Sequence, residues 1–331
     1  RDAMAMQAIP SFNVVYADRE GTIAYYYNAA IPVRAAGVDW SRPVPGDRSD
    51  LLWRGVRPFG SAPHVVRPRS GFVVNGNNNP FEATAPQDAP RAEDFPPEYG
   101  IDRRTTNRGL RLLELYGTDE AITGAAFVAY KMDHLYAADS RLARLIDALL
   151  ADGEALKDPD LVEPLGVLRG WARDAHQDSR SAALAIRTGR LALDWYLAGE
   201  TPEVADPKAA LKQAAAELRA AFGRIDPAWG EAMRLRRGDK SWPLNGAMET
   251  LRAVYPKGDD VRGAWTAAGG DTYIVYADWP ADGGPPAIRT IHQFGSATLD
   301  AASPHYADQA PLFAAEEWKT PPMALDALLA E

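Results

Sequence analysis

Residues 75–80 are the part of the sequence best suited to chemistry, because they read Asn-Gly-Asn-Asn-Asn-Pro directly after the apolar run 72–74. A side-chain amide carries two N–H donors and no charge, so an amide held at a strand end can stabilise an oxygen that becomes negative during acyl transfer. Asparagine, glycine and proline are also the usual residues of turns. The cluster therefore predicts either an oxyanion-binding amide or an asparagine-rich turn.

The histidines indicate no other catalytic chemistry. They form neither an HExxH motif nor a paired ligand arrangement, so we expect no metal centre made by this chain alone. His176 and His305 each have an aspartate and a serine nearby, but no GxSxG motif accompanies them, and we interpret both as structural. The glycine pairs at 269–270 and 283–284 belong to no GxGxxG or Walker motif, so we expect no nucleotide cofactor.

The composition narrows the class of protein. The chain has 331 residues, of which 46% are hydrophobic, and this is enough to bury a large core. Its formal net charge of −9 argues against a nucleic-acid partner, because binding a polyanion requires concentrated Lys and Arg. No apolar run approaches the ~20 residues of a membrane span. The lack of cysteine excludes disulfides and thiolate nucleophiles.

The elements that lead to the asparagine cluster are predicted to be β-strands. Residues 12–17 and 22–27 are rich in aromatic and β-branched side chains and flank Asp-Arg-Glu-Gly at 18–21, which indicates a hairpin. A further short strand is expected at 72–75 and would deliver the asparagines. Four prolines between residues 86 and 97 exclude helix and interior strand there, leaving a long surface excursion.

After residue 104 the apolar period becomes that of an α-helix. From Leu142, apolar residues recur at i, i+3, i+4 and i+7, and Asp206-Pro207 is typical of a helix start. Residues 105–222 are therefore predicted to be helical. Strands return at 272–277 and 287–294, on either side of a Gly-Gly-Pro-Pro turn. This order of elements predicts an α+β fold.

Several short segments, in a fixed order along nearly the whole chain, support a more specific interpretation. They are residues 12–18, 21–25, 31–34, 43–46, 58–59, 70–72, 77–80 (NNNP), 107–113 (NRGLRLL), 229–231 (WGE), 243–246 (PLNG) and 303–309 (SPHYADQ). Together they resemble the penicillin acylase family, which includes aculeacin-type and acyl-homoserine-lactone acylases. No single segment is diagnostic, but coincidence does not explain so many colinear ones.

The resemblance implies an N-terminal-nucleophile (Ntn) hydrolase with a four-layer αββα sandwich, in which a large helical insertion interrupts the core. In this family a serine exposed by self-cleavage attacks the amide, uses its own α-amino group as base and forms an acyl-enzyme. No serine here matches that residue. We therefore expect the chain to be the C-terminal part of the β subunit, inactive alone, with the α subunit and the N-terminal part of β as its partners.

Within such a β subunit we expect three segments. Residues 1–104 would be the β-rich part of the Ntn core that carries the oxyanion-hole strand. Residues 105–235 would be the helical block, and residues 236–331 would be a β-containing segment that returns to the core.

The resemblance also assigns residues. Asn77 matches the family's oxyanion-hole asparagine, and Arg108 matches an arginine that organises the site near the nucleophile's amino group. The alternative for Arg108 is a solvated arginine at a helix start, with Arg103 or Arg104 in the organising role. Phe12 matches a position that lines the acyl pocket, where an apolar wall favours a hydrophobic acyl chain. Its alternative is a core aromatic residue on a strand.

Calcium bridges the subunits in some family members. Trp40 matches the position of a carbonyl ligand, and Asp94 or Glu93 that of a carboxylate ligand. Two oxygens are too few for a closed Ca²⁺ shell, so the sequence leaves calcium binding by the complete enzyme open.

The function implied by the resemblance is the removal of an acyl group from an N-acyl small molecule by a periplasmic or secreted amide hydrolase. Candidate substrates are an acyl-homoserine lactone, an acylated peptide and a β-lactam. The alternative is a non-catalytic module, derived from the acylase fold, that binds a ligand or a partner.

Overall fold

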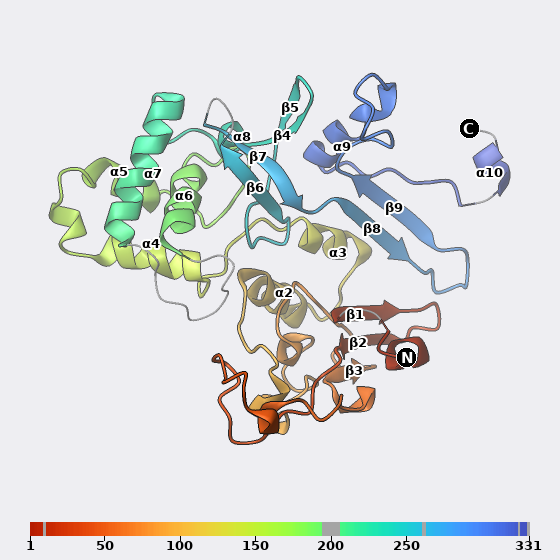
Figure 1. Cartoon of the computed structure of the whole chain (residues 1–331). Coiled ribbons are helices and arrows are strands. Elements are labelled where there is room, and N and C mark those ends of the chain that lie inside the picture. The colour runs from red at the N-terminus through yellow and green to blue at the C-terminus, as the bar shows by residue number, and fades with distance from the viewer. Residues whose placement is uncertain (9–10, 194–205, 260–262, 324, 330–331) are drawn as a thin grey trace. The chain divides into compact units, whose positions relative to one another are not determined.

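The computed structural model describes residues 1–8, 11–193, 206–259, 263–323 and 325–329. The chain divides into two compact units, residues 1–120 and residues 121–331. Figure 1 shows the helices and strands of both units and labels the main ones.

The first unit is built on a three-stranded antiparallel sheet with the order β1-β2-β3 (Figure 1). Its strands are β1 (Phe12–Ala17), β2 (Ile23–Asn28) and β3 (His64–Val66). The predicted hairpin is confirmed, and its turn is closed by the Thr22 N–H, which donates to Asp18 Oδ1 at 2.8 Å. Gly21 has a φ of 78°, which glycine adopts without steric cost. On the central strand, Tyr25 is fully buried and packs with Val65.

Short helices connect the rest of the first unit. They are α1 (Asp2–Ala5), η1 (Ser49–Leu51), η2 (Phe59–Ser61), η3 (Pro80–Glu82), η4 (Ala92–Asp94) and η5 (Pro97–Tyr99). Of these, η3 begins directly after the asparagine cluster.

The strand predicted at 72–75 is not formed. The Phe72 carbonyl accepts the Thr84 hydroxyl at 2.8 Å, and the Val74 N–H donates to the Ala83 carbonyl at 2.8 Å. One backbone bond and one side-chain bond replace the ladder that a strand requires. The residues before the asparagines are therefore extended chain held by the segment that follows η3.

The first unit ends in helix α2 (Asn107–Thr118), which packs on this extended chain. Thr106 caps the helix by accepting the Gly109 N–H at 3.2 Å. Two turns later Tyr116 is buried, and its ring lies 5.8 Å from that of Phe72. The Tyr116 contact packs α2 on the extended chain, and the start of the helix approaches the asparagine cluster at Gly76 and Gly109.

The second unit holds most of the helices within the predicted block 105–235, whereas α2, the first of them, belongs to the first unit. Its helices are α3 (Gly124–Lys131), α4 (Arg141–Ala151), α5 (Val162–Arg169), α6 (Ala182–Ala192), α7 (Pro207–Phe222) and α8 (Trp229–Ala232), with the 3-10 turn η6 (Ala155–Lys157). Ser140 and Asp206 cap α4 and α7, and Pro207 occupies the first position of α7 as predicted. The apolar face predicted from Leu142 onward is buried in the core.

Two sheets complete the second unit. Strands β4 (Met233–Arg237), β5 (Lys240–Pro243), β6 (Val254–Asp259) and β7 (Trp265–Gly270) form a sheet of order β5-β4-β7-β6, in which β4 and β7 are parallel. The predicted hairpin is confirmed as β8 (Tyr273–Asp278) and β9 (Ala287–His292). The turn η7 (Pro304–Tyr306) and helices α9 (Ala310–Ala315) and α10 (Leu325–Leu329) follow. The predicted α+β class is confirmed.

None of the helices within the described residues combines the length and the apolar character needed to cross a membrane.

Candidate active site

The asparagine cluster is a tight turn in which three of the four amides are engaged internally. Asn78 is 2% exposed, accepts the Gly76 N–H at 2.7 Å and donates to the Glu82 carbonyl at 3.0 Å. Asn79 is 5% exposed and caps η3 by accepting the Phe81 N–H at 3.0 Å. Asn75 accepts the Asn77 N–H at 3.3 Å through its side-chain oxygen. These bonds satisfy backbone groups that the sharp turn would otherwise leave without partners.

Asn77 differs from its three neighbours. Its residue is exposed, its φ is 63°, and its side-chain amide makes no hydrogen bond within the part of the chain that the structure describes. Asparagine tolerates this left-handed backbone better than most residues. The turn therefore has two amide donors without a partner among the described residues, the exposed amide of Asn77 and the buried Nδ2 of Asn75, and of these only that of Asn77 is exposed.

Arg108 lies against the same turn. A Cβ added to Gly76 would be only 2.9 Å from the Arg108 Cβ and 3.1 Å from Leu112 Cδ1, so the helix and the turn touch at glycine. The Arg108 Nε is buried and has no hydrogen-bond partner among the described residues. The structure thus brings together Asn77, through its neighbour Gly76, and Arg108.

The two alternative arginines are occupied elsewhere. Arg103 donates to the carbonyls of Ala92 and Phe95 at 3.0 and 2.9 Å. Arg104 pairs with Asp102, which accepts its Nε at 2.8 Å. Of the three arginines considered from the sequence, Arg108 is therefore the one left to interact with a bound molecule.

Glu82 is a site residue that sequence reasoning missed. One of its carboxylate oxygens accepts the Thr105 hydroxyl, and the other is buried without a hydrogen-bond partner in the described chain. Burial raises the pKa of Glu82, although the hydrogen bond from Thr105 acts in the opposite direction. A half-buried acid with a raised pKa beside a turn is a common property of functional sites, but this one is visible only once residues 82 and 105 are known to meet.

Phe12 is not a core residue of the described unit, since it is 60% exposed on the outer strand β1. The register pairs Val14 with Tyr26 and Tyr26 with His64, so Phe12 shares a sheet face with these three residues. On that face Tyr26, His64 and Val66 line a cavity of about 400 Å³ together with Arg1, Phe59 and Gly60.

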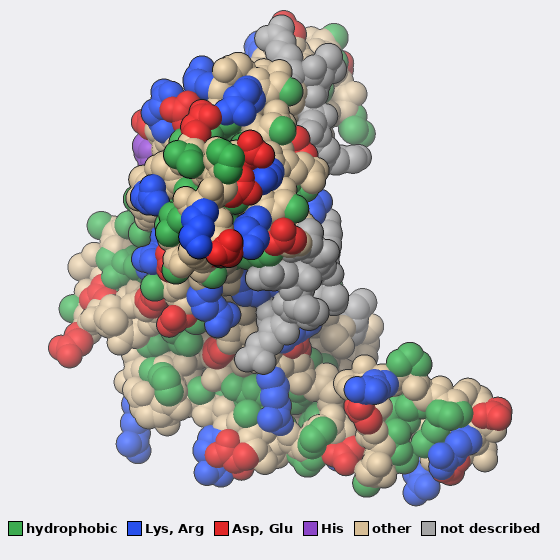
Figure 2. Space-filling model, turned by 90° about the vertical axis from the view of Figure 1, so that its left-hand side faces the viewer, with side chains coloured by type: hydrophobic (Ala, Val, Ile, Leu, Met, Phe, Trp, Pro, Cys, Tyr) green, Lys and Arg blue, Asp and Glu red, His purple; other side chains and the backbone are tan. Residues whose placement is uncertain are grey.

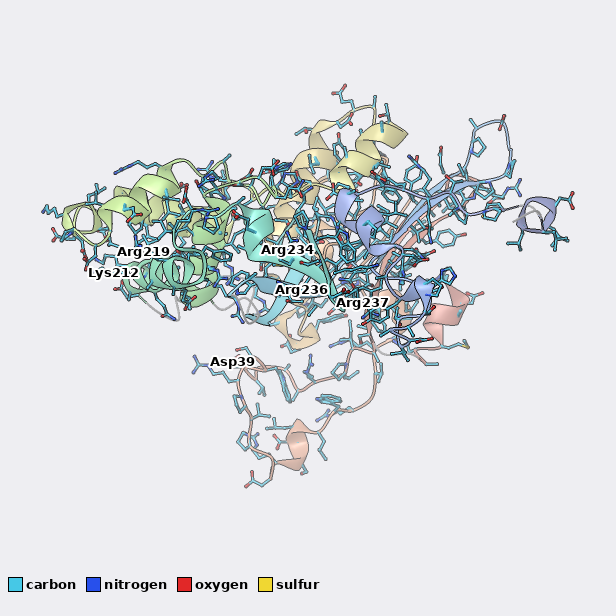
Figure 3. The ribbon with its side chains drawn as sticks, turned by 90° about the horizontal axis from the view of Figure 1, so that it is seen from above. Asp39, Lys212, Arg219, Arg234, Arg236 and Arg237 are labelled. Atoms are coloured by element: carbon cyan, nitrogen blue, oxygen red, sulfur yellow. The ribbon has the colours of Figure 1, made fainter. Side chains whose placement is uncertain are left out.

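The carboxylate proposed as a calcium ligand is paired with an arginine, and the Trp40 side chain is hydrogen-bonded nearby. The Asp94 carboxylate faces Arg91 at 2.8 Å, and the Trp40 Nε1 donates to the Ala35 carbonyl at 2.9 Å. Asp39, labelled in Figure 3, is the carboxylate next to Trp40 and accepts the Ser41 N–H at 3.0 Å. Across the described ranges no three metal-ligating side chains come together. These residues alone do not fit a calcium shell.

The histidine-containing triads considered from the sequence lack the required geometry. His305 Nδ1 lies 2.8 Å from Asp308, but the Ser303 hydroxyl accepts the backbone N–H of His305 and caps the turn η7. His176 accepts the Asp178 N–H through Nδ1 at 3.3 Å. A triad requires the imidazole to join a carboxylate to a serine hydroxyl.

The cationic side chains of the second unit are largely engaged by protein groups. Figure 2 shows cationic and anionic side chains interspersed over helices α5 and α7. On α7, Lys212 lies 2.8 Å from Asp158, and Arg219 pairs with Glu163 at 2.5 Å (Figure 3). On β4, the Arg237 guanidinium stacks between two aromatic rings, 4.4 Å from the centroid of Phe294 and 3.9 Å from that of Tyr306. Mixed charges of this kind do not form a surface for polyanions.

Comparisons with known proteins agree on one family. A family profile described as penicillin amidase matches residues 1–329. Penicillin G acylase of Escherichia coli is 42% identical over 76 residues, which are 23% of this chain and 9% of that protein. The solved structure of a thermostable penicillin G acylase from Alcaligenes faecalis is similar with a TM-score of 0.54 and 17% identity, over 99% of this chain and 67% of that one. At that identity the structural match shows the fold alone.

Proposed function

Because the chain belongs to the penicillin amidase family, we propose that it is the C-terminal β-subunit part of an N-acyl amide hydrolase and supplies the oxyanion-binding side of its active site. The remainder of the enzyme, including the serine nucleophile and the rest of the four-layer sandwich, would come from residues outside this sequence. The chain matches only 9% of the length of its E. coli relative, so the activity of the whole protein belongs to this proposal.

The free amide of Asn77 is the observation that supports this role best. Attack on an amide carbonyl creates an oxyanion, and an N–H donor fixed before the reaction stabilises that charge more than it stabilises the neutral carbonyl. The internal bonds of Asn78 and Asn79 hold the turn rigid, so the Asn77 donor needs little reorganisation when the charge develops. Arg108 would add a permanent positive charge beside the same turn.

If Phe12 lines the acyl pocket, as proposed from the resemblance, its apolar ring would suit a hydrophobic acyl group. Acyl-homoserine lactones, acylated peptides and acylated β-lactams all carry such a group on an amide nitrogen. Hydrolysis of extracellular molecules of this kind fits a periplasmic or secreted enzyme. Any calcium would need further ligands from the rest of the enzyme, because the two oxygens offered by Trp40 and Asp94 are too few for a closed shell.

The experiment is substitution of Asn77 in the enzyme that carries this chain together with its nucleophile. Asn77→Ala and Asn77→Gly both remove the donor and should lower kcat about a hundredfold or more, while maturation and folding are retained. The glycine variant matters because alanine at a φ of 63° adds a backbone strain of about 1–2 kcal/mol, whereas glycine adds none.

Arg67→Gly is the matched control, since Arg67 is also an exposed residue with positive φ, at 52°, but lies next to strand β3. Its kcat should equal that of the wild type. If kcat of Asn77→Gly stayed within about threefold of wild type, which is less than about 1 kcal/mol, Asn77 would not be the oxyanion donor. If instead the complete protein turned over none of the N-acyl amides, the non-catalytic binding module would be the better description.

A further inference from the structure

We propose that Glu82 is a positioning residue of this site, which joins the asparagine turn to the start of helix α2 through the Thr105 hydroxyl and so fixes Asn77 relative to Arg108. This proposal rests on the function proposed above.

The geometry of Glu82 suits such a link. Glu82 is the last residue of η3, the short helix that begins immediately after the asparagine turn, and its side chain accepts the Thr105 hydroxyl across 23 residues of sequence. Thr105 directly precedes Thr106, the cap of α2. The bond therefore connects the two segments that carry the candidate catalytic groups.

Neighbouring contacts join the same two segments, but none of them carries a charge. Asn79 donates to the carbonyls of Arg103 and Arg104 at 3.3 and 3.1 Å, in the backbone that precedes the helix. Gly109 allows close approach, because a Cβ there would lie 2.9 Å from the Asn78 Cβ. A contact between small groups sets a minimum separation, whereas the charged hydrogen bond of Glu82 draws the segments together.

Stability alone does not account for a carboxyl group at this position. One of its oxygens is buried without a partner in the described part of the chain, and burial of a carboxylate in that way opposes folding. A glutamine would keep an acceptor for Thr105 without a buried charge. The contact to which we assign the positioning role is therefore the bond to Thr105, which glutamine can also make, and not the charge of the carboxylate.

The test compares Glu82→Ala and Thr105→Val, which break the link, with Glu82→Gln and Thr105→Ser, which can preserve it. The two breaking variants should each lower kcat about tenfold or more with KM little changed, because misplaced groups weaken transition-state binding. The two conservative variants should stay within about threefold of wild type. The double variant Glu82→Ala/Thr105→Val should be no worse than either single variant, since both remove the same bond.

Rates are normalised to the concentration of acyl-enzyme formed in the first turnover, so a loss of folded protein does not imitate a loss of kcat. Glu114→Ala is the control, because Glu114 is an exposed carboxylate on the same helix that pairs with Arg111, and its kcat should not change. If Glu82→Ala does not fold, the Thr105 pair still decides the question.

Two outcomes overturn the proposal and are distinguishable. If Asn77→Gly abolishes turnover while Glu82→Ala and Thr105→Val stay near wild type, or their losses add in the double variant, the positioning role is wrong and the proposed function stands. If Asn77→Gly itself leaves kcat unchanged, the proposed function fails and the role of Glu82 fails with it.

Discussion

Substitution of Gly109 by alanine tests whether close packing of helix α2 on the asparagine turn matters. Gly109 is the third residue of α2, and an added Cβ would lie 2.9 Å from the Asn78 Cβ and 3.3 Å from a carboxylate oxygen of Glu82. Carbon atoms pack best at about 3.5–4.0 Å, so the helix and the turn must separate by roughly 0.6–1.1 Å. The methyl group is too short to rotate out of the way.

Two opposing effects set the change in stability. Alanine is favoured over glycine within a helix by about 1 kcal/mol, whereas overpacking costs about 1–3 kcal/mol. Gly117 lies in the same helix, and a Cβ added there would meet no atom of the described residues within 4 Å, so Gly117→Ala keeps only the favourable effect. The free energy of unfolding of Gly109→Ala should therefore fall below that of Gly117→Ala by about 1–3 kcal/mol in urea titrations.

Catalysis should respond more strongly than stability. A displacement of up to about 1 Å between reacting groups can lower a rate by about a hundredfold, so we expect kcat of Gly109→Ala to fall by about tenfold to a hundredfold. Gly117→Ala should keep the wild-type kcat. If Gly109→Ala were as stable and as active as Gly117→Ala, the packing of α2 on the turn would have no part in the function, and the reasoning would be refuted.

Two further predictions concern charge. Burial raises the pKa of Glu82 above its value in the unfolded chain, so the folded state binds more protons between the two pKa values and its stability falls as pH rises through that window. The stability of Glu82→Gln relative to wild type should therefore increase from about pH 4 upward in thermal unfolding. A stability difference that did not change with pH would contradict the raised pKa of Glu82. Arg252 is 1% exposed and donates hydrogen bonds to Glu316 and Asp271 at 3.1 and 3.3 Å. Arg252→Met should lower the free energy of unfolding by about 3–5 kcal/mol, against less than about 1 kcal/mol for Arg219→Met, which removes an exposed ion pair. Equal losses would show that these buried ion pairs do not stabilise the fold.

The sequence predicted those helices and strands that depend mainly on residues close together in the chain. The hairpin of β1 and β2 follows from two runs rich in aromatic and β-branched residues around a glycine turn, and the buried face of α4 follows from apolar residues at helical spacing. Strands β4 and β7 were not predicted, because Met-Arg-Leu-Arg-Arg and Trp-Thr-Ala-Ala-Gly-Gly carry few β-branched residues. Their parallel pairing joins residues about thirty positions apart and depends on tertiary packing.

Contacts between distant residues also limited what the sequence could predict about the candidate site. Asn77 and Arg108 could be named from short motifs, but the predicted strand at 72–75 is extended chain, because a side-chain bond from Thr84 replaces a strand partner. Glu82 has no motif, and its role depends on the approach of residue 105, which no local pattern indicates.

The backbone conformation of residue 77 distinguishes two explanations of the asparagine turn, one in which Asn77 serves folding and one in which it serves catalysis. Glycine adopts a φ of 63° without strain, so a turn selected for stability alone would favour glycine there, as at Gly71 in the same segment, where φ is 77°. Asparagine at this position keeps an amide that makes no bond within the described residues, while Asn78 and Asn79 are buried and satisfied. Asn77→Gly should therefore keep the melting temperature of the protein and lose its turnover, and a large loss of both would indicate that the Asn77 amide serves the fold.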